Sequence, residues 1–299
     1  MRVAILGNLN LDLVFQVARL PEPHEKMGAE SVTIDGGGAP ANVAWWLARL
    51  GHEVEYFAVA GDDPLSGVTV DSLARAGVGT GGIRRCPEIG PTLAVILANG
   101  SDKRMIGARA GCADRAAEAW KTLVAETDFS SFDRLHTMAR AHPLLFTPNR
   151  RADLAGIPVS ADLNGQYSAD VAADFDLCIS NHDELARYTG RRDMPAMIAA
   201  DLAGKPHHVV ITSGAEEVAA YRPAGTTRVV PPPVEAVDRS GAGDAFCAGY
   251  LHAAWQGLTP EDAIHTGLRL AAAAMSGPGC RPDTDASAAA VAAVRAETS

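Results

Sequence analysis

The sequence predicts an α/β protein: a single three-layer α/β/α domain with a central, mostly parallel sheet and a small β-rich lid. Short apolar runs of strand length alternate with helical segments, which is typical of a parallel sheet covered on both faces. The chain has 299 residues, of which 47% are hydrophobic, so one sizeable core can form. Glycines and polar residues follow several of the apolar runs, where open α/β sheets bind their ligands.

The composition argues against several classes of protein. The formal net charge of -10 disfavours a nucleic-acid binder, which normally carries a basic face. No apolar run approaches the roughly 20 residues that span a bilayer, so we expect no membrane partner. The five cysteines are scattered and include no C-x-x-C pair, which disfavours a disulfide framework or a zinc site. This cysteine usage favours a reducing cytoplasm.

The expected elements follow from apolar periodicity. Residues 3–6 form the first buried strand, in a run too short for the apolar region of a signal sequence. Further strands are expected at residues 54–60, 135–138, 159–162, 177–180 and 209–213, with an antiparallel pair at 218–221 and 227–230. Helices are expected at residues 43–50, 66–76, 113–126, 245–256, 260–275 and 286–296.

Residues 13–35 and about 84–110 are expected to form the lid. The first stretch lacks helical periodicity, is interrupted by prolines and contains short alternating runs. The second contains two strand-like runs on either side of Asn99-Gly100, a dipeptide typical of hairpin turns, before residues 107–111 return to the main body. Because lid strands present an edge that can pair with another chain, a homodimer through the lid is an open expectation.

A glycine turn late in the chain is the strongest candidate for a functional site. Residues 238–246 follow an extended run and lead into a helix, with Gly241 and Gly243 on either side of Ala242. Backbone N–H groups at a helix N-terminus attract anions, phosphate above all. Asp244 lies in this turn, where it can cap the helix or act as a base beside a phosphate. Near the positive helix end, its pKa is expected to be low.

A second glycine turn opens an earlier helix. Gly36, Gly37 and Gly38 allow close approach of the backbone to a ligand, and Asn42 lies in the first helical turn. The same run fits the dinucleotide fingerprint G-x-G-x-x-[GA], which leaves an NAD-dependent oxidoreductase as an alternative. Such a fingerprint should directly follow the first strand, however, and here the first strand is followed by Asn and Asp residues.

Polar pairs follow several of the predicted strands. Asn10 and Asp12 come after the first strand and are two residues apart, so in an extended segment they face the same way and suit a pair of hydroxyls. Similar pairs follow three later strands: Asp162 with Asn164, Asn181 with Glu184, and Thr212 with Gly214. Each pair alone is typical of a cap or turn. Together, at one rim of a parallel sheet, they favour a binding site.

These motifs resemble the ribokinase-like (PfkB) family of carbohydrate and nucleoside kinases. Residues 238–244 resemble the carboxyl-terminal signature of that family, and residues 37–42 resemble its amino-terminal one. The three polar pairs at residues 10–12, 181–184 and 212–214 fall in the order found in the family, so the resemblance spans nearly the whole chain. It implies ATP-dependent transfer of the γ-phosphoryl group to a primary hydroxyl of a free sugar, with a nucleoside as the alternative acceptor.

The resemblance also implies roles for individual residues. Asp244 would be the catalytic base, beside an anion hole formed by the N–H groups of Gly241, Ala242 and Gly243. The residues that would hold the acceptor are Asn10, Asp12, Gly37, Gly38, Asn42 and Arg109. Those that would line the nucleotide are Asn181, Thr212, Gly214 and Gly243. Glu184 and Asn181 would hold Mg²⁺, largely through water, and a K⁺ ion would lie near Asp238, Ser240 and Gly279.

The sequence departs from the family pattern at two places. Arg239 stands where a small or hydroxyl residue is usual, and it could reach a phosphate or disturb the neighbouring cation loop. Many sugar kinases carry a Glu after the strand near residue 137, but residues 136–140 contain no carboxylate, which leaves the acceptor open. A phosphorylated acceptor would need a basic pocket, for which Arg109, Lys103 and Arg104 are the candidates.

Overall fold

Seven strands of the central sheet run parallel in the computed structural model, which describes residues 1–99, 103–147, 154, 156–164, 168–190 and 208–298. They are β1 (Arg2–Leu6), β4 (Glu53–Gly61), β5 (Ile83–Cys86), β8 (Arg134–Met138), β9 (Val159–Asp162), β10 (Leu177–Asn181) and β11 (His208–Thr212). An antiparallel pair, β12 (Val218–Arg222) and β13 (Gly225–Val229), extends one edge. The strand order is β13-β12-β11-β10-β9-β8-β1-β4-β5.

Both faces of this sheet are covered, as its sequence pattern requires. In β1, Val3 and Ile5 belong to one hydrophobic core, while Ala4 and Leu6 belong to a second core on the opposite face. The side chains alternate between two apolar environments, so the strand has an almost continuous apolar sequence. The mostly parallel sheet and its two cores confirm the predicted three-layer α/β/α fold.

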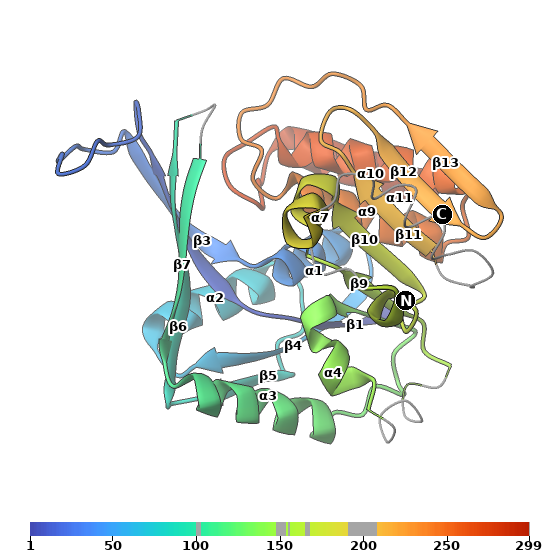
Figure 1. Ribbon diagram of the computed structural model, residues 1–299, viewed down its shortest axis with the longest axis horizontal. Helices are drawn as coiled ribbons and strands as arrows, with labels where there is room; N and C mark the ends of the chain where they lie inside the picture. The colour runs from blue at the N-terminus through green and yellow to red at the C-terminus, as the bar shows by residue number, and fades with distance from the viewer. Residues whose placement is uncertain (100–102, 148–153, 155, 165–167, 191–207, 299) are drawn as a thin grey trace.

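The helices divide between the two faces (Figure 1). One core contains residues of α1 (Ala39–Arg49), α2 (Pro64–Arg75), α9 (Ala242–Trp255), α10 (Pro260–Ala274) and α11 (Asp285–Glu297). The other contains residues of α3 (Ala113–Glu126), α4 (His142–Leu145), α6 (Ala169–Ala172) and α7 (His182–Thr189), and a 3₁₀ turn at Ala139–Ala141 precedes α4. No helix within the described part of the chain is long and apolar enough to cross a membrane.

A separate four-stranded sheet projects from one side of the molecule (Figure 1). Its strands are β2 (Asn10–Gln16), β3 (Ser31–Gly37), β6 (Ile89–Ala98) and β7 (Lys103–Gly111), in the order β3-β2-β6-β7. The β6–β7 pair is the hairpin expected around Asn99-Gly100, although Gly100 lies outside the described residues. Edge strands β3 and β7 each have one side without a strand partner in this sheet.

The second sheet has different bounds from those expected. Asn10 and Asp12 lie in an extended segment, as expected, but this segment is already β2 of the second sheet, where they pair with Gly37 and Asp35 of β3. Residues 107–111 continue β7 instead of leaving the sheet. Ile83–Cys86 is a short edge strand of the central sheet, paired with β4. Its sequence, Ile-Arg-Arg-Cys, lacks the apolar run that identifies the other central strands.

The glycine turn of residues 238–246 does not follow a strand directly, contrary to expectation. β13 ends at Val229, and residues 230–241 contain neither helix nor strand. Pro231, Pro232 and Pro233 explain this, because proline has no backbone N–H to donate to a strand ladder. The turn is instead held by contacts with the loop that precedes α11.

Candidate active site

The late glycine turn caps α9 against the loop that precedes α11. Gly241 is the N-cap residue, with φ of 73°, in the left-handed region that favours glycine. A Cβ atom at this position would lie 2.7 Å from the Cα of Cys280. Among the described residues no side chain caps the helix, so its N-terminus offers backbone N–H groups to an anion, as the sequence predicts.

The early glycine turn brings Asn42 to the same place. Gly38 is the N-cap residue of α1, with φ of 98°, and a Cβ there would lie 2.8 Å from the carbonyl oxygen of Asn8. The buried Asn42 side chain donates a hydrogen bond from Nδ2 to Oδ2 of Asp244, at 2.6 Å. Two motifs 202 residues apart in the sequence therefore meet through one hydrogen bond.

The environment of Asp244 changes its expected ionisation. Burial raises the pKa of this carboxyl to about 7, and the negative charges of Asp162 and Asp12 act in the same direction. The hydrogen bond from Asn42 and the positive charge of Arg281 oppose the rise. The expectation of a low pKa was therefore wrong, because desolvation outweighs the favourable helix end. A carboxylate with a pKa near neutrality is well suited to general-base catalysis.

Asp12 lies directly over the early glycine turn. A Cβ atom on Gly37 would collide with the Asp12 carboxylate, so this position accepts only glycine unless the carboxylate moves. Oδ2 of Asp12 is 4.0 Å from Sγ of Cys280, on the loop that also contacts Gly241. The Asn10 side chain accepts a hydrogen bond of 2.8 Å from Asn8. The structure thus brings Asp12 and Gly37 next to the loop that packs on the α9 turn.

A cavity of about 740 Å³ lies between the second sheet and the carboxyl ends of central strands. Its size is in the range of small-molecule sites. The lining includes Asn10, Trp120, Met138, Arg140 and Asn164, but not Asp12, Asn42 or Asp244. Asn10 and Asp12 share strand β2, so the cavity adjoins the residues around Asp244 through that strand.

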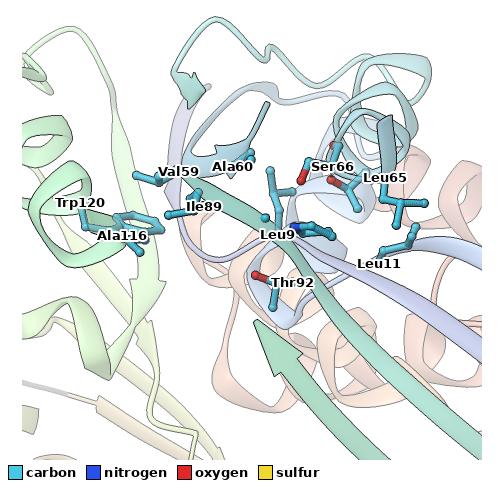
Figure 2. Close-up of a pocket in the computed structure, with 14 residues that line it drawn as sticks. Leu9, Leu11, Val59, Ala60, Leu65, Ser66, Ile89, Thr92, Ala116 and Trp120 are labelled. Atoms are coloured by element: carbon cyan, nitrogen blue, oxygen red, sulfur yellow. Dashed lines mark hydrogen bonds between the residues drawn. The ribbon is translucent and has the colours of Figure 1, made fainter. Parts of the chain in front are cut away.

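A smaller cavity at the junction of the two sheets is not a substrate site. Figure 2 shows it enclosed by side chains from β4, α2, β6 and α3, among them Val59, Ser66, Ile89 and Trp120. Its volume is about 10 Å³. That is about the volume needed for one water molecule.

The residues expected at the nucleotide lie at the ends of neighbouring parallel strands. Asn181 ends β10 and pairs in register with Thr212, which ends β11. Gly214 follows two residues later with φ of 57°. The Asn181 side chain caps α7, because its Oδ1 accepts hydrogen bonds from the amides of Asp183 and Glu184 at 2.9 and 3.3 Å. Three of the four predicted residues are thus brought together, and Asn181 also serves as a helix cap. The fourth, Gly243, lies in the first turn of α9.

The donor set fits a magnesium ion bound partly through water. Glu184 is half-buried in the first turn of α7. Burial raises the pKa of Asp162 at the end of β9 to about 6, and the nearby Glu184 acts in the same direction. The described residues contain no group of three or more His, Cys, Asp or Glu side chains positioned to hold a metal. Such sparse carboxylates suit Mg²⁺, which usually keeps several waters and binds substrate phosphates.

The residues expected near a potassium ion are connected by hydrogen bonds to the carboxylate of Asp238. Oδ1 of Asp238 accepts a hydrogen bond from the amide of Ser240 at 2.8 Å, and its Oδ2 accepts one from the amide of Gly279 at 2.9 Å. The carboxylate therefore links the α9 turn to the loop before α11. This arrangement fits a loop pair that could surround a monovalent cation.

Neither of the two arginines selected from the sequence is among the described side chains of this cluster. Arg239 has an exposed side chain beside the α9 turn. Arg109 pairs with Thr92 in the second sheet, but its side chain lies outside the described part of the molecule.

Arg281 and Ser72 are near the site, but the sequence did not single them out for it, whereas Asp162 was selected only as one of the polar pairs that follow strands. Arg281 is buried and donates from Nε to Oδ1 of Asn42 at 2.8 Å and from Nη1 to Oγ of Ser72 at 3.0 Å. An arginine in a Gly- and Pro-rich loop carries no sequence signal of burial. Asp162 was noticed as a strand-end residue, but it also makes a local turn contact, since its Oδ1 accepts from the amide of Asn164.

The dinucleotide interpretation of the early glycines has no support. Gly36 and Gly37 belong to β3 of the second sheet, and α1 follows that strand. A dinucleotide fingerprint instead occupies the first βα turn of the central sheet.

Comparisons with known proteins agree with this geometry. The family described as pfkB family carbohydrate kinase matches residues 1–287. An ATP-dependent ribose-1-phosphate kinase of Halopiger xanaduensis is 29% identical, and the match covers 87% of this chain and 86% of that protein. A putative ribokinase from Agrobacterium tumefaciens superposes with a TM-score of 0.80 at 19% identity, covering 99% of this chain and 98% of that one. A putative ribokinase II from E. coli, solved with ATP and Mg²⁺, superposes with a TM-score of 0.74 at 18% identity, covering 99% of each chain.

Proposed function

This chain belongs to the pfkB family of carbohydrate kinases and is a small-molecule kinase, and on that premise we propose that it transfers the γ-phosphoryl group of ATP to a primary hydroxyl of a free sugar. One observation carries the proposal. Asp244 lies at the uncapped N-terminus of α9, held by Asn42 from the other glycine turn, with a pKa near neutrality. A base and an anion-binding helix end are thus side by side, as phosphoryl transfer requires.

In the proposed reaction, Asp244 accepts the proton of the attacking hydroxyl. The N–H groups of the turn formed by Gly241, Ala242 and Gly243 face the transferred phosphoryl group and stabilise its charge. Asn10, Asp12 and Asn42 orient the acceptor, with Gly37 and Gly38 allowing its close approach. Asp162, Glu184 and Asn181 are the residues that would hold magnesium, which would supply positive charge to neutralise the charge that develops on the phosphates.

The proposal also covers the nucleotide, a potassium ion and the lid. Thr212, Gly214 and Gly243 line the nucleotide. The putative ribokinase II from E. coli, which has a similar fold, was solved with ATP and Mg²⁺. Asp238, Ser240 and Gly279 are the residues that would hold a potassium ion, which would supply positive charge beside the anion hole. The second sheet acts as a lid that closes over the acceptor and excludes water, which suppresses hydrolysis of ATP. The free cysteines support action in a reducing cytoplasm.

A second candidate acceptor is a phosphorylated sugar. Arg140 and Lys121 line the large cavity, while residues 136–140 lack the carboxylate that many sugar kinases carry there. Arginine and lysine bind phosphate groups well. A nucleoside stays an alternative, since Trp120 and Met138 give the same cavity an apolar wall.

An acceptor panel tests the proposal. ADP formation would be measured with ATP and Mg²⁺, with and without K⁺, for pentoses, hexoses, sugar phosphates and nucleosides. We expect acceptor-dependent ADP and phosphorylated product for a sugar, with a higher rate when K⁺ is present. Preference for a sugar phosphate would select the second candidate, and the absence of acceptor-dependent ADP across the panel would contradict the function.

A further inference from the structure

Arg281 is a buried cation close to the proposed catalytic base. Its side chain is 6% exposed, on the loop between α10 and α11. Nε donates to Asn42 on α1, and Nη1 donates to Ser72 on α2, whose hydroxyl in turn donates to Asp35 at 3.1 Å. Nη2 is buried without a hydrogen-bond partner among the described residues. The loop is thereby fixed to two helices and to β3.

This burial has an energetic cost that no ion pair offsets. No carboxylate of the described residues forms an ion pair with Arg281, whereas buried charges are normally paired. Its two hydrogen-bond partners are neutral side chains, while the carboxylates of Asp35 and Asp12 favour its charge from beyond ion-pair distance. The charge of Arg281 is thus placed among the carboxylates of the candidate site.

The role of Arg281 follows from the chemistry of the Asn42 amide. Arginine only donates hydrogen bonds, so the Nε–H of Arg281 must face the oxygen of the Asn42 amide, Oδ1. The amide nitrogen of Asn42, Nδ2, then faces Asp244 and donates to it. If the amide were flipped, two donors would face each other at Arg281 and two acceptors would face each other at Asp244. Arg281 thus fixes the orientation in which Asn42 holds Oδ2 of the carboxylate at 2.6 Å and leaves Oδ1 to receive the proton.

We propose that Arg281 is a positioning residue for phosphoryl transfer, acting through the hydrogen-bonded series Ser72–Arg281–Asn42–Asp244. The inference rests on the proposed function, because it assigns Asp244 the role of base. It adds a residue whose side chain need not touch the acceptor or the nucleotide. Its effect is to hold one oxygen of the base and to keep the base ionised.

Arg281 keeps the base ionised through its place among the charges that surround Asp244. Among the described groups that shift the pKa of Asp244, Arg281 is the one with a positive charge. Facing it are the carboxylates of Asp12 on β2 and Asp162 on β9, and close by are two groups that stay protonated at neutral pH, the Tyr56 phenol and the Cys247 thiol. Loss of the cation would leave carboxylates opposite one another, so Asp244 would hold its proton to a higher pH.

Two substitutions separate charge from geometry. Arg281→Gln removes the charge and should lower kcat by about 10-fold or more, since general bases contribute roughly 10²–10⁴-fold. It should also move the acidic limb of the pH–rate profile upward by about one unit and leave KM for ATP within about twofold. Arg281→Lys keeps the charge but loses the planar guanidinium that donates to both Asn42 and Ser72. Its kcat should therefore fall, with a smaller shift of the acidic limb of the pH–rate profile. Arg269→Gln, at an exposed ion pair with Glu297, is the matched control and should change neither.

A measurement without turnover separates this inference from the proposed function. The Asp244 carboxyl would be titrated by ¹³C NMR in the full chain, assigned with Asp244→Asn, for the wild type and for Arg281→Gln. A higher pKa in the variant supports positioning even if no acceptor is phosphorylated. An unchanged titration together with unchanged kcat would overturn the inference while leaving the kinase intact. If Arg281→Gln does not fold, Arg281→Lys and Ser72→Ala take its place, and wild-type kcat in both would overturn it equally.

Discussion

At the scale of single residues, Asp244 shows how neighbours decide what a side chain does. Its sequence context is equally typical of a helix cap and of a base. In the structure, burial raises the pKa of Asp244 to about 7 and Asn42 donates a hydrogen bond to it, and both features favour the proposed base. Asp12 and Asn42 could be selected from the sequence, because Asp12 follows the first strand two residues after Asn10 and Asn42 follows a glycine turn. Arg281 could not, because its burial depends on three segments that meet only in the fold.

The raised pKa of Asp244 predicts a pH dependence. The base must be ionised to accept a proton, and it holds its own proton below about pH 7. We therefore expect kcat/KM for the acceptor, which at saturating ATP reports the enzyme–ATP complex before the acceptor binds, to rise with pH and level off above about 7. The measurement is acceptor-dependent ADP formation between pH 5.5 and 9 at saturating ATP. A profile that is flat across this range would show that the carboxyl titrates elsewhere.

At the scale of elements, the close packing of α9 on α10 holds the α9 turn in place. A Cβ on Gly249 would lie 2.9 Å from the carbonyl oxygen of Thr266 and 3.0 Å from the Cα of Gly267. The two helices therefore approach closely because both carry glycine at the contact. The helices were predictable from periodicity, but this contact was not, since an isolated helical glycine gives no indication of its partner. Likewise β5 was missed because its four residues lack an apolar pattern.

Gly249→Ala should destabilise the protein by forcing α9 and α10 apart. We expect a loss of about 1–3 kcal/mol in the free energy of unfolding, the usual effect of overpacking. Urea unfolding followed by circular dichroism measures it. Gly67→Ala in α2 is the control, because a Cβ there would meet nothing within 4 Å. It should stabilise the helix by roughly 0.5–1 kcal/mol. Equal stability of the two variants would contradict the packing argument.

At the scale of the whole molecule, the second sheet projects beside the central sheet and exposes apolar side chains on both edge strands. Val32 and Ile34 on β3 are 49% and 59% exposed, and Met105 and Ile106 on β7 are 64% and 71% exposed. The sequence predicted a β-rich excursion but not these bounds, because the sheet combines segments far apart in the chain. Exposed apolar groups on free edges are typical of strand-mediated association.

We therefore expect a homodimer formed through the second sheet. Sedimentation velocity should show a dimer for the wild type at micromolar concentration. Ile34→Glu combined with Ile106→Glu should give a folded monomer, because charges at sheet edges oppose pairing. Val237→Glu is the matched control, an equally exposed apolar residue at 67% outside this sheet, and should stay dimeric. A wild-type monomer at every concentration tested would rule out the lid as an interface.

The most direct test of the central claim, that Asp244 is the base of an ATP-dependent phosphoryl transfer, is the turnover of Asp244→Ala. With the acceptor identified by the panel, acceptor-dependent ADP formation would be compared in wild type and variant, and ATP binding would be measured by calorimetry. We predict a loss of about 10²-fold or more in kcat, the scale of a lost general base, with ATP affinity nearly unchanged. Turnover at the wild-type rate in a variant that binds ATP normally would contradict the assignment.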